Sequence, residues 1–145
     1  MRLKTHIRLF TLMLCLINTA AYASAQACLS YDDAGVQLRG KLGRKTFPGP
    51  PNYESVRRGD KPETYWILHL AKPICTTANA DDGAESNVTD LQLILSPKDY
   101  ALFKKLLGRK DVLVSGKLMH AITGHHHTPV LMEVRVIGIH KARQF

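Results

Sequence analysis

Residues 110–139 read KDVLVSGKLMH, then AITGHHHTP, then VLMEVRVIGI. Two runs rich in β-branched residues flank a short polar link that contains glycine, which is the pattern of a β-hairpin. Alternate side chains of a strand share a face, and the even-numbered residues form the more apolar set in both runs. The pattern therefore predicts a hairpin in which even-numbered residues pair, for example Val114 with Val134, and in which three histidines lie at the tip.

The predicted register decides where the histidines lie. It places His120 opposite Thr128 and diagonal to His126, whereas His125 and His127 project from the other face. Imidazole binds zinc and copper well, but a site usually has three or four ligands, so a zinc or copper site would use His120, His126 and a third group. Two other roles are open to these histidines. They are either polar residues at the end of a loop that make local hydrogen bonds, or residues that contact a partner directly.

Residues 1–25 have the three parts of a secretory signal peptide. A basic start precedes an apolar core at residues 9–17, and small residues follow up to Ala25. The core is too short to span a membrane, and we expect cleavage after Ala25. Cleavage leaves residues 26–145 as one domain and lowers the formal net charge from +8 to +5, because the removed segment holds three basic residues and no acid. Export would place the protein in the bacterial periplasm or outside the cell.

Cleavage also leaves two cysteines, Cys28 and Cys75. Cysteines of exported proteins usually pair, so we expect one disulfide between them. A redox or metal pair would have closer Cys-x-x-Cys spacing. Cys28 lies near the cleavage site, but the residues before it do not form a lipidation signal.

Apolar alternation predicts three further strands, at residues 34–42, 64–70 and 88–95. A helix follows, for which we expect Ser96 to be the N-cap and Gly108 to end the helix. Three strands, a helix and two strands are the chain order of the OB-fold, a five-stranded Greek-key barrel. We therefore expect a mainly β protein, an OB-like barrel with one short helix between strands three and four. We also expect a monomer without a transmembrane segment.

Residues 47–63 contain four prolines, two glycines and several charges, which exclude regular structure. A loop of this length is usually functional or disordered, and we expect an ordered loop because Phe47, Tyr53 and Val56 can pin it to the body. Its charged residues, Asp60 among them, are interpreted as solvated.

Ligands of the OB-fold bind across strands two and three and at the loops that join strands one to two and four to five. In this chain those loops are residues 47–63 and 121–129. We therefore predict a recognition surface where the two loops meet at one rim of the barrel. The predicted binding residues are Tyr53, Arg57, Arg58, His125 and His127.

Five segments also carry a family resemblance: TFPGPPNYES at 46–55, GD at 59–60, ETYW at 63–66, KPIC at 72–75 and TGHHHTPV at 123–130. They resemble a bacterial exported family, domain of unknown function four-four-three-one. The resemblance covers nearly the whole mature chain and implies an exported bacterial domain. It implies no activity and no catalytic residue.

The residues favour binding over catalysis. Ser115 is not part of a nucleophile-elbow sequence, and no nucleophile is recognisable beside the histidines, so we expect neither an enzyme nor a cofactor. We predict an exported binding module for an acidic or envelope-associated partner, which is a protein, a glycan or an anionic lipid head group. Export argues against nucleic acid. The alternative is a periplasmic zinc- or copper-binding protein that uses the histidines of the 120–127 hairpin. The basic residues that suit an acidic partner are Arg39, Lys41, Arg44, Lys45, Arg57 and Arg58.

Overall fold

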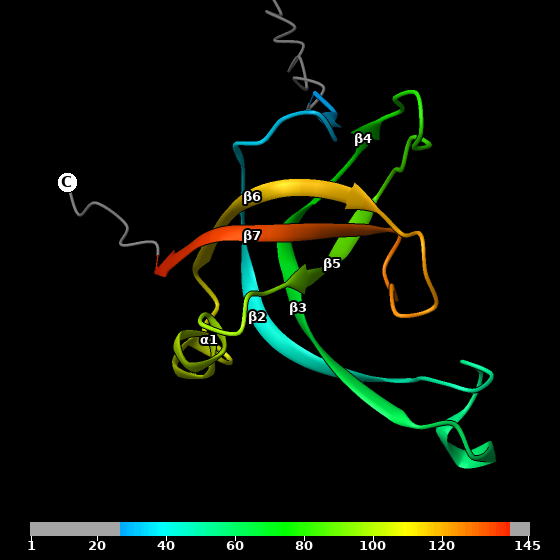
Figure 1. The fold of residues 1–145 in the computed structure, drawn as a ribbon. Coiled ribbons are helices and arrows are strands. Elements are labelled where there is room, and N and C mark those ends of the chain that lie inside the picture. The colour runs from blue at the N-terminus through cyan, green and yellow to red at the C-terminus, as the bar shows by residue number, and fades with distance from the viewer. Residues whose placement is uncertain (1–26, 140–145) are drawn as a thin grey trace, which may run out of the picture.

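The computed structural model describes residues 27–139, and the predicted signal peptide, residues 1–25, lies outside them. Five long strands carry the fold: β2 (Val36–Pro48), β3 (Pro62–Ile74), β5 (Val88–Ile94), β6 (Val112–His120) and β7 (Val130–Ile139) (Figure 1). The smaller elements are two short strands, β1 (Leu29–Ser30) and β4 (Thr76–Thr77), the 3-10 turn η1 (Val56–Arg58) and the helix α1 (Tyr100–Leu106).

The five long strands close into a barrel in the order β2, β3, β5, β7, β6. Neighbouring strands are antiparallel except β5 and β7, which run parallel. With α1 between β5 and β6, this arrangement confirms the predicted OB-like barrel. None of the helices within residues 27–139 is long and apolar enough to cross a membrane.

The core forms because apolar side chains alternate along the strands. In β2, Val36, Leu38 and Leu42 are buried and alternate with exposed polar residues, as predicted. Gly40 shares their face, and a Cβ atom there would lie 2.2 Å from the carbonyl oxygen of His69. The absence of a side chain at Gly40 therefore lets β2 and β3 approach closely where the barrel bends.

The predicted pairing of Val114 with Val134 is wrong, because Val114 lies opposite Ile137. The register of β6 and β7 shifts at the Ser115–Gly116 step, where one strand contributes an extra residue. Beyond that step the phase of β7 is inverted, so Val136 points outward and is 62% exposed. Local alternation could not reveal this bulge, because each strand alone is regular.

Helix α1 begins later than predicted. Asp99 is the N-cap, and the Ser96 hydroxyl donates to the Asp99 carboxylate instead of capping the helix. Phe103 and Leu106 are buried against the barrel. Gly108 adopts a φ of 80°, which permits the left-handed turn that ends the helix, as predicted.

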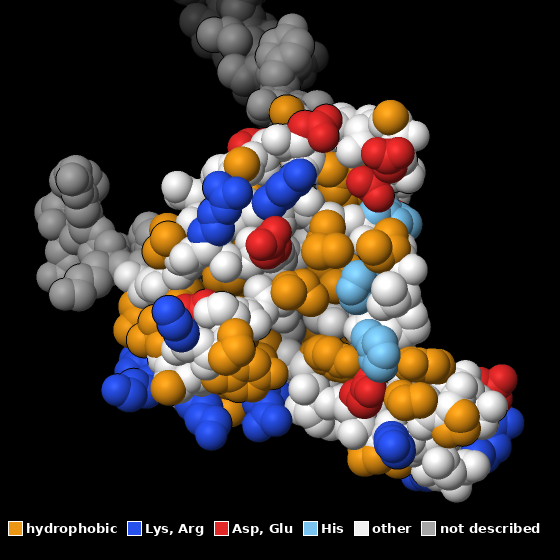
Figure 2. Space-filling model, in the orientation of Figure 1, with side chains coloured by type: hydrophobic (Ala, Val, Ile, Leu, Met, Phe, Trp, Pro, Cys, Tyr) orange, Lys and Arg blue, Asp and Glu red, His pale blue; other side chains and the backbone are white. Residues whose placement is uncertain are grey.

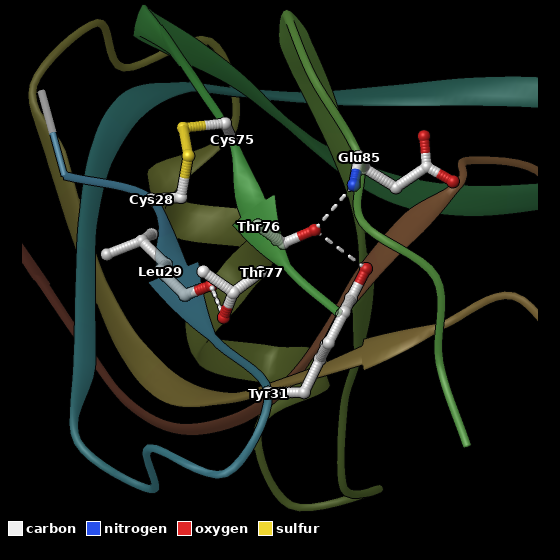
Figure 3. The surroundings of a disulfide bond; sticks show 7 residues. All are labelled: Cys28, Leu29, Tyr31, Cys75, Thr76, Thr77 and Glu85. Carbon is white, nitrogen blue, oxygen red and sulfur yellow. Dashed lines mark hydrogen bonds between the residues drawn. A yellow bond between two sulfur atoms is a disulfide. The ribbon is translucent and has the colours of Figure 1, made fainter. Parts of the chain in front are cut away.

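The predicted disulfide between Cys28 and Cys75 is confirmed (Figure 3). It ties the start of the described chain to the end of β3, where β1 and β4 pair in parallel. The Thr76 hydroxyl donates to the hydroxyl of the buried Tyr31 over 3.0 Å and accepts the Glu85 N–H over 2.9 Å. These contacts lie at the end of the barrel away from the β2–β3 hairpin (Figure 1).

Candidate functional site

The proline-rich segment is more regular than the sequence predicts. Strand β2 continues to Pro48 and β3 begins at Pro62, so Phe47 pairs with Glu63 inside the ladder. The two strands have no other neighbours here, and a proline is tolerated at such an edge because its missing N–H breaks no second ladder. Residues 47–63, called the flap from here on, therefore project from the barrel as an ordered hairpin (Figure 1).

Asp60 holds the end of the flap together. Its carboxylate accepts backbone N–H groups of Asn52 at 2.9 Å, Glu54 at 2.8 Å and Ser55 at 2.7 Å. These bonds, with that from Ser55 first, hold the pKa of Asp60 below its ordinary value of 3.8. The side chain is buried, so the interpretation of Asp60 as a solvated charge is wrong. Sequence spacing gives no sign of it, because all three donors are backbone groups.

His125 joins the β6–β7 loop to the flap. Its Nδ1 lies 2.8 Å from Oε2 of Glu63, and its Nε2 lies 3.3 Å from the hydroxyl of Tyr53. The Tyr65 hydroxyl donates to the same Glu63 oxygen over 2.7 Å. The predicted meeting of the two loops at one rim is thereby confirmed. Figure 2 shows histidine side chains at this junction, with hydrophobic side chains around them.

The charges of this cluster are set by its hydrogen bonds. Donation from Tyr65, and next from His125, holds the pKa of Glu63 below its ordinary value, so the carboxylate is ionised. Burial, followed by the bond to Glu63, raises the pKa of Tyr65 to about 12. An ionised Glu63 can only accept a hydrogen bond, so Nδ1 of His125 carries the proton of the bond between them.

His127 lies beside this cluster with its ring held between aromatic side chains. It stacks on Phe47 with ring centroids 4.3 Å apart and an angle of 2°, and Tyr65 lies 5.2 Å away at 50°. Burial lowers the pKa of His127, so the imidazole is neutral at pH 7. Its Nε2 is buried without a hydrogen-bond partner among the described residues.

Gln92 positions the histidine loop, and sequence reasoning missed it. Its side chain is buried, donates to the His125 carbonyl over 2.9 Å and accepts the His127 N–H over 2.8 Å. Its own N–H donates to the hydroxyl of Thr128. The available signal was a single glutamine in the otherwise apolar run 91–95, because a buried amide needs hydrogen-bond partners.

The predicted binding residues are brought together only in part. Tyr53, His125 and His127 lie at the junction described above. Arg57 and Arg58 belong to η1 at the far end of the flap, and Arg58 pairs with Glu54 over 2.8 Å (Figure 1). The two arginines are therefore not part of the His125 cluster.

The two histidines of the metal hypothesis make separate contacts. His120 lies opposite Val130, not opposite Thr128 as predicted, and its Nε2 is 2.9 Å from Oε1 of Glu85. Nδ1 of His126 accepts the N–H of Ile122, and burial lowers the pKa of this imidazole. Within residues 27–139 no three His, Cys, Asp or Glu side chains form a group suited to a metal ion.

One family model matches this chain over residues 90–137, from β5 through the histidine loop to β7. The model is that of Domain of unknown function (DUF4431), to which this segment is similar. The match confirms the resemblance for the histidine-containing part, whereas the flap lies outside the matched residues. Neither a curated protein nor a solved structure matches the chain. The DUF4431 match brings no activity with it, so the roles of the residues rest on their geometry.

Proposed function

We propose that this protein is an exported, non-catalytic binding module that recognises an envelope-associated partner at the rim formed by the flap and residues 121–129. The observation that carries the proposal is the contact of Glu63 with His125, which joins two loops 62 residues apart. In an OB-like barrel these loops border the ligand-binding face. Export is supported by the sequence of residues 1–25 and by the disulfide, since such bonds persist outside the cytoplasm.

A binding role fits the cluster better than catalysis. The polar atoms of Glu63 and His125 are engaged by Tyr65 and Tyr53, so they hold the rim in place. A rim preorganised in this way loses little entropy when a ligand binds.

Of the partner classes that the sequence predicts, a glycan suits the rim best. Acidic partners would need free basic side chains, but two of the six predicted ones are paired, Arg39 with Asp111 over 2.7 Å and Arg58 with Glu54. Arg44 lies over the ring of Trp66, 5.5 Å from its centroid. The rim itself is rich in aromatic side chains, which offer apolar faces to sugar rings, and OB-folds bind oligosaccharides through these loops.

Retention by envelope glycans tests the proposal. Protein purified from the periplasm is incubated with sacculi and with lipopolysaccharide, and the bound fraction is measured by sedimentation. We expect the wild type to be retained and Tyr53→Ala to bind at least tenfold more weakly. Tyr100→Ala is the matched control, because this tyrosine is also exposed but lies on α1, away from the rim. The proposal would be contradicted if the wild type is retained on neither material. It would also be contradicted if Tyr53→Ala and Tyr100→Ala are retained equally.

The metal-binding alternative has its own test. Calorimetric titration of the protein with zinc and copper, on wild type and His120→Gln/His126→Gln, distinguishes the two functions. We expect neither metal to bind above the level of the double variant. Stoichiometric binding that the double variant loses would favour the alternative.

A further inference from the structure

A pocket lies beside the rim, separate from the contact between Glu63 and His125. It has a volume of about 250 Å³ and is formed by Lys45 of β2, residues 86–90 at the start of β5, and residues 127–129. His127 belongs to both the pocket and the rim. The volume is below the range of about 300–1,000 Å³ that holds drug-sized ligands, so the pocket suits one small ring.

His127 has unused hydrogen-bonding capacity in this pocket. Its plane is fixed by Phe47 and Tyr65, and its backbone N–H is held by Gln92. No hydrogen bond within the described residues uses either ring nitrogen, and Nε2 is buried. A buried polar atom without a partner is costly, and a fixed one is preorganised for a ligand.

The charges of the pocket favour an uncharged ligand. Lys45 contributes one positive charge, 5.0 Å from the ring centroid of Phe47. Asp90 contributes one negative charge, and His69 lies 2.8 Å from its carboxylate. Asp90 would repel an anion such as phosphate, and Lys45 would repel a cation. A neutral polar group is repelled by neither.

The rest of the lining offers hydroxyl and amide groups, from Ser86, Asn87 and Thr89. Asn87 adopts a φ of 53°, which asparagine tolerates better than most residues. Hydroxyl and amide groups can both donate and accept, so this lining matches a ligand whose hydroxyl groups do the same.

We propose that this pocket binds one neutral sugar unit, with the imidazole of His127 and the amide of Asn87 as hydrogen-bonding groups. The proposal rests on the proposed function, because it makes the pocket a subsite of the glycan that the rim contacts. The pocket, on the β5 side of His127, would then determine which sugar is bound. The flap would contact the rest of the glycan.

NMR titration of the isotope-labelled protein tests the pocket directly. Glucose, galactose and N-acetylglucosamine are added up to tens of millimolar, with inorganic phosphate as the charged comparison. We expect at least one sugar to shift the amide signals of residues 86–90 and 127–129, and phosphate to leave them unchanged. Shifts with phosphate alone, or with no probe at all, would overturn the proposal.

Two variants keep the fold while removing a polar group. His127→Phe preserves the aromatic stack on Phe47, and Asn87→Gly preserves the positive φ. We expect each to weaken sugar binding at least tenfold, whereas Gln37→Ala, at an exposed position of β2 outside the pocket and the flap, leaves it unchanged. Unchanged sugar affinity in both pocket variants would also overturn the proposal.

The envelope assay separates the two proposals. If sacculi or lipopolysaccharide retain the wild type but no single sugar binds the pocket, the rim function stands and the pocket proposal fails. If a single sugar binds and neither envelope material retains the protein, the pocket stands as a site of its own and the rim function fails.

Discussion

Glu63 and His125 are 62 residues apart in the chain, and 2.8 Å separates Oε2 of the first from Nδ1 of the second. The contact joins the start of β3 to the loop between β6 and β7, two segments that no local pattern connects. It fixes the flap against the barrel and contributes, after the bond from Tyr65, to the lowered pKa of Glu63.

Removal of the Glu63 charge should lower the pKa of Tyr65. Burial is the first cause of the value of about 12 and the bond to Glu63 is the second, so Glu63→Gln should move it only part of the way towards 10. Absorbance of tyrosinate during an alkaline titration measures the change. Glu54→Gln, which removes a carboxylate that pairs with Arg58, is the control and should leave the curve as in the wild type.

The flap should lose its order in acid. The pKa of Asp60 is lower in the folded protein than its ordinary value of 3.8, so its contribution is complete above 3.8 and is lost as the pH falls through the lowered value. Amide hydrogen exchange of Asn52, Glu54 and Ser55 should therefore accelerate below pH 4 relative to the barrel core. Asp60→Asn should show that loss of protection already at pH 7. Protection in the variant equal to that of the wild type would rule out this role for Asp60.

His120 and Glu85 should make stability depend on pH in the opposite sense. The hydrogen bond to Glu85 holds the pKa of His120 above 6.5. Protonated His120 therefore contributes its full stabilisation below pH 6.5. This contribution is lost as the pH rises through the raised pKa of the folded protein. We expect the Tm of the wild type to fall by a few degrees across this window, and that of His120→Gln to fall less. Glu85→Gln should reduce the dependence of Tm on pH equally. If Tm still falls steeply in either variant, other groups cause the dependence.

The backbone approach at Gly116 should tolerate no side chain. A Cβ atom there would lie 2.0 Å from the carbonyl oxygen of Glu133, so Gly116→Ala must displace backbone. Overpacking of this kind costs about 1–3 kcal/mol, which urea unfolding monitored by Trp66 fluorescence can measure. Gly138→Ala in β7 is the matched control, because a Cβ atom there meets nothing within 4 Å.

Loss of the disulfide should destabilise the whole barrel. Cys28 and Cys75 are 47 residues apart, and release of a loop of this length costs about 4 kcal/mol in the chain-entropy model. We expect Cys28→Ser/Cys75→Ser to lower the urea midpoint strongly and to match the reduced wild type. A midpoint within error of the oxidised protein would show that β1 and β4 hold this end without the bond.

Local patterns account for the order of the elements. Strand alternation in β2 and the left-handed stop at Gly108 depend on neighbours within a few residues, so both could be predicted. The register of β6 and β7 could not, because the bulge at Ser115–Gly116 depends on how closely two backbones approach in the closed barrel. For the site, Tyr53 and His125 could be named, whereas the buried roles of Asp60 and Gln92 could not.

The sequence by itself determined five strands, one helix, one disulfide and the two unusual loops, because side-chain period, turn residues and cysteine count are readable along the chain. Only the tertiary structure decided that His125 meets Glu63 and that His127 lies between two aromatic rings. Such contacts arise when the barrel closes, and closure depends on the sum of many strand pairings that no single stretch of sequence contains.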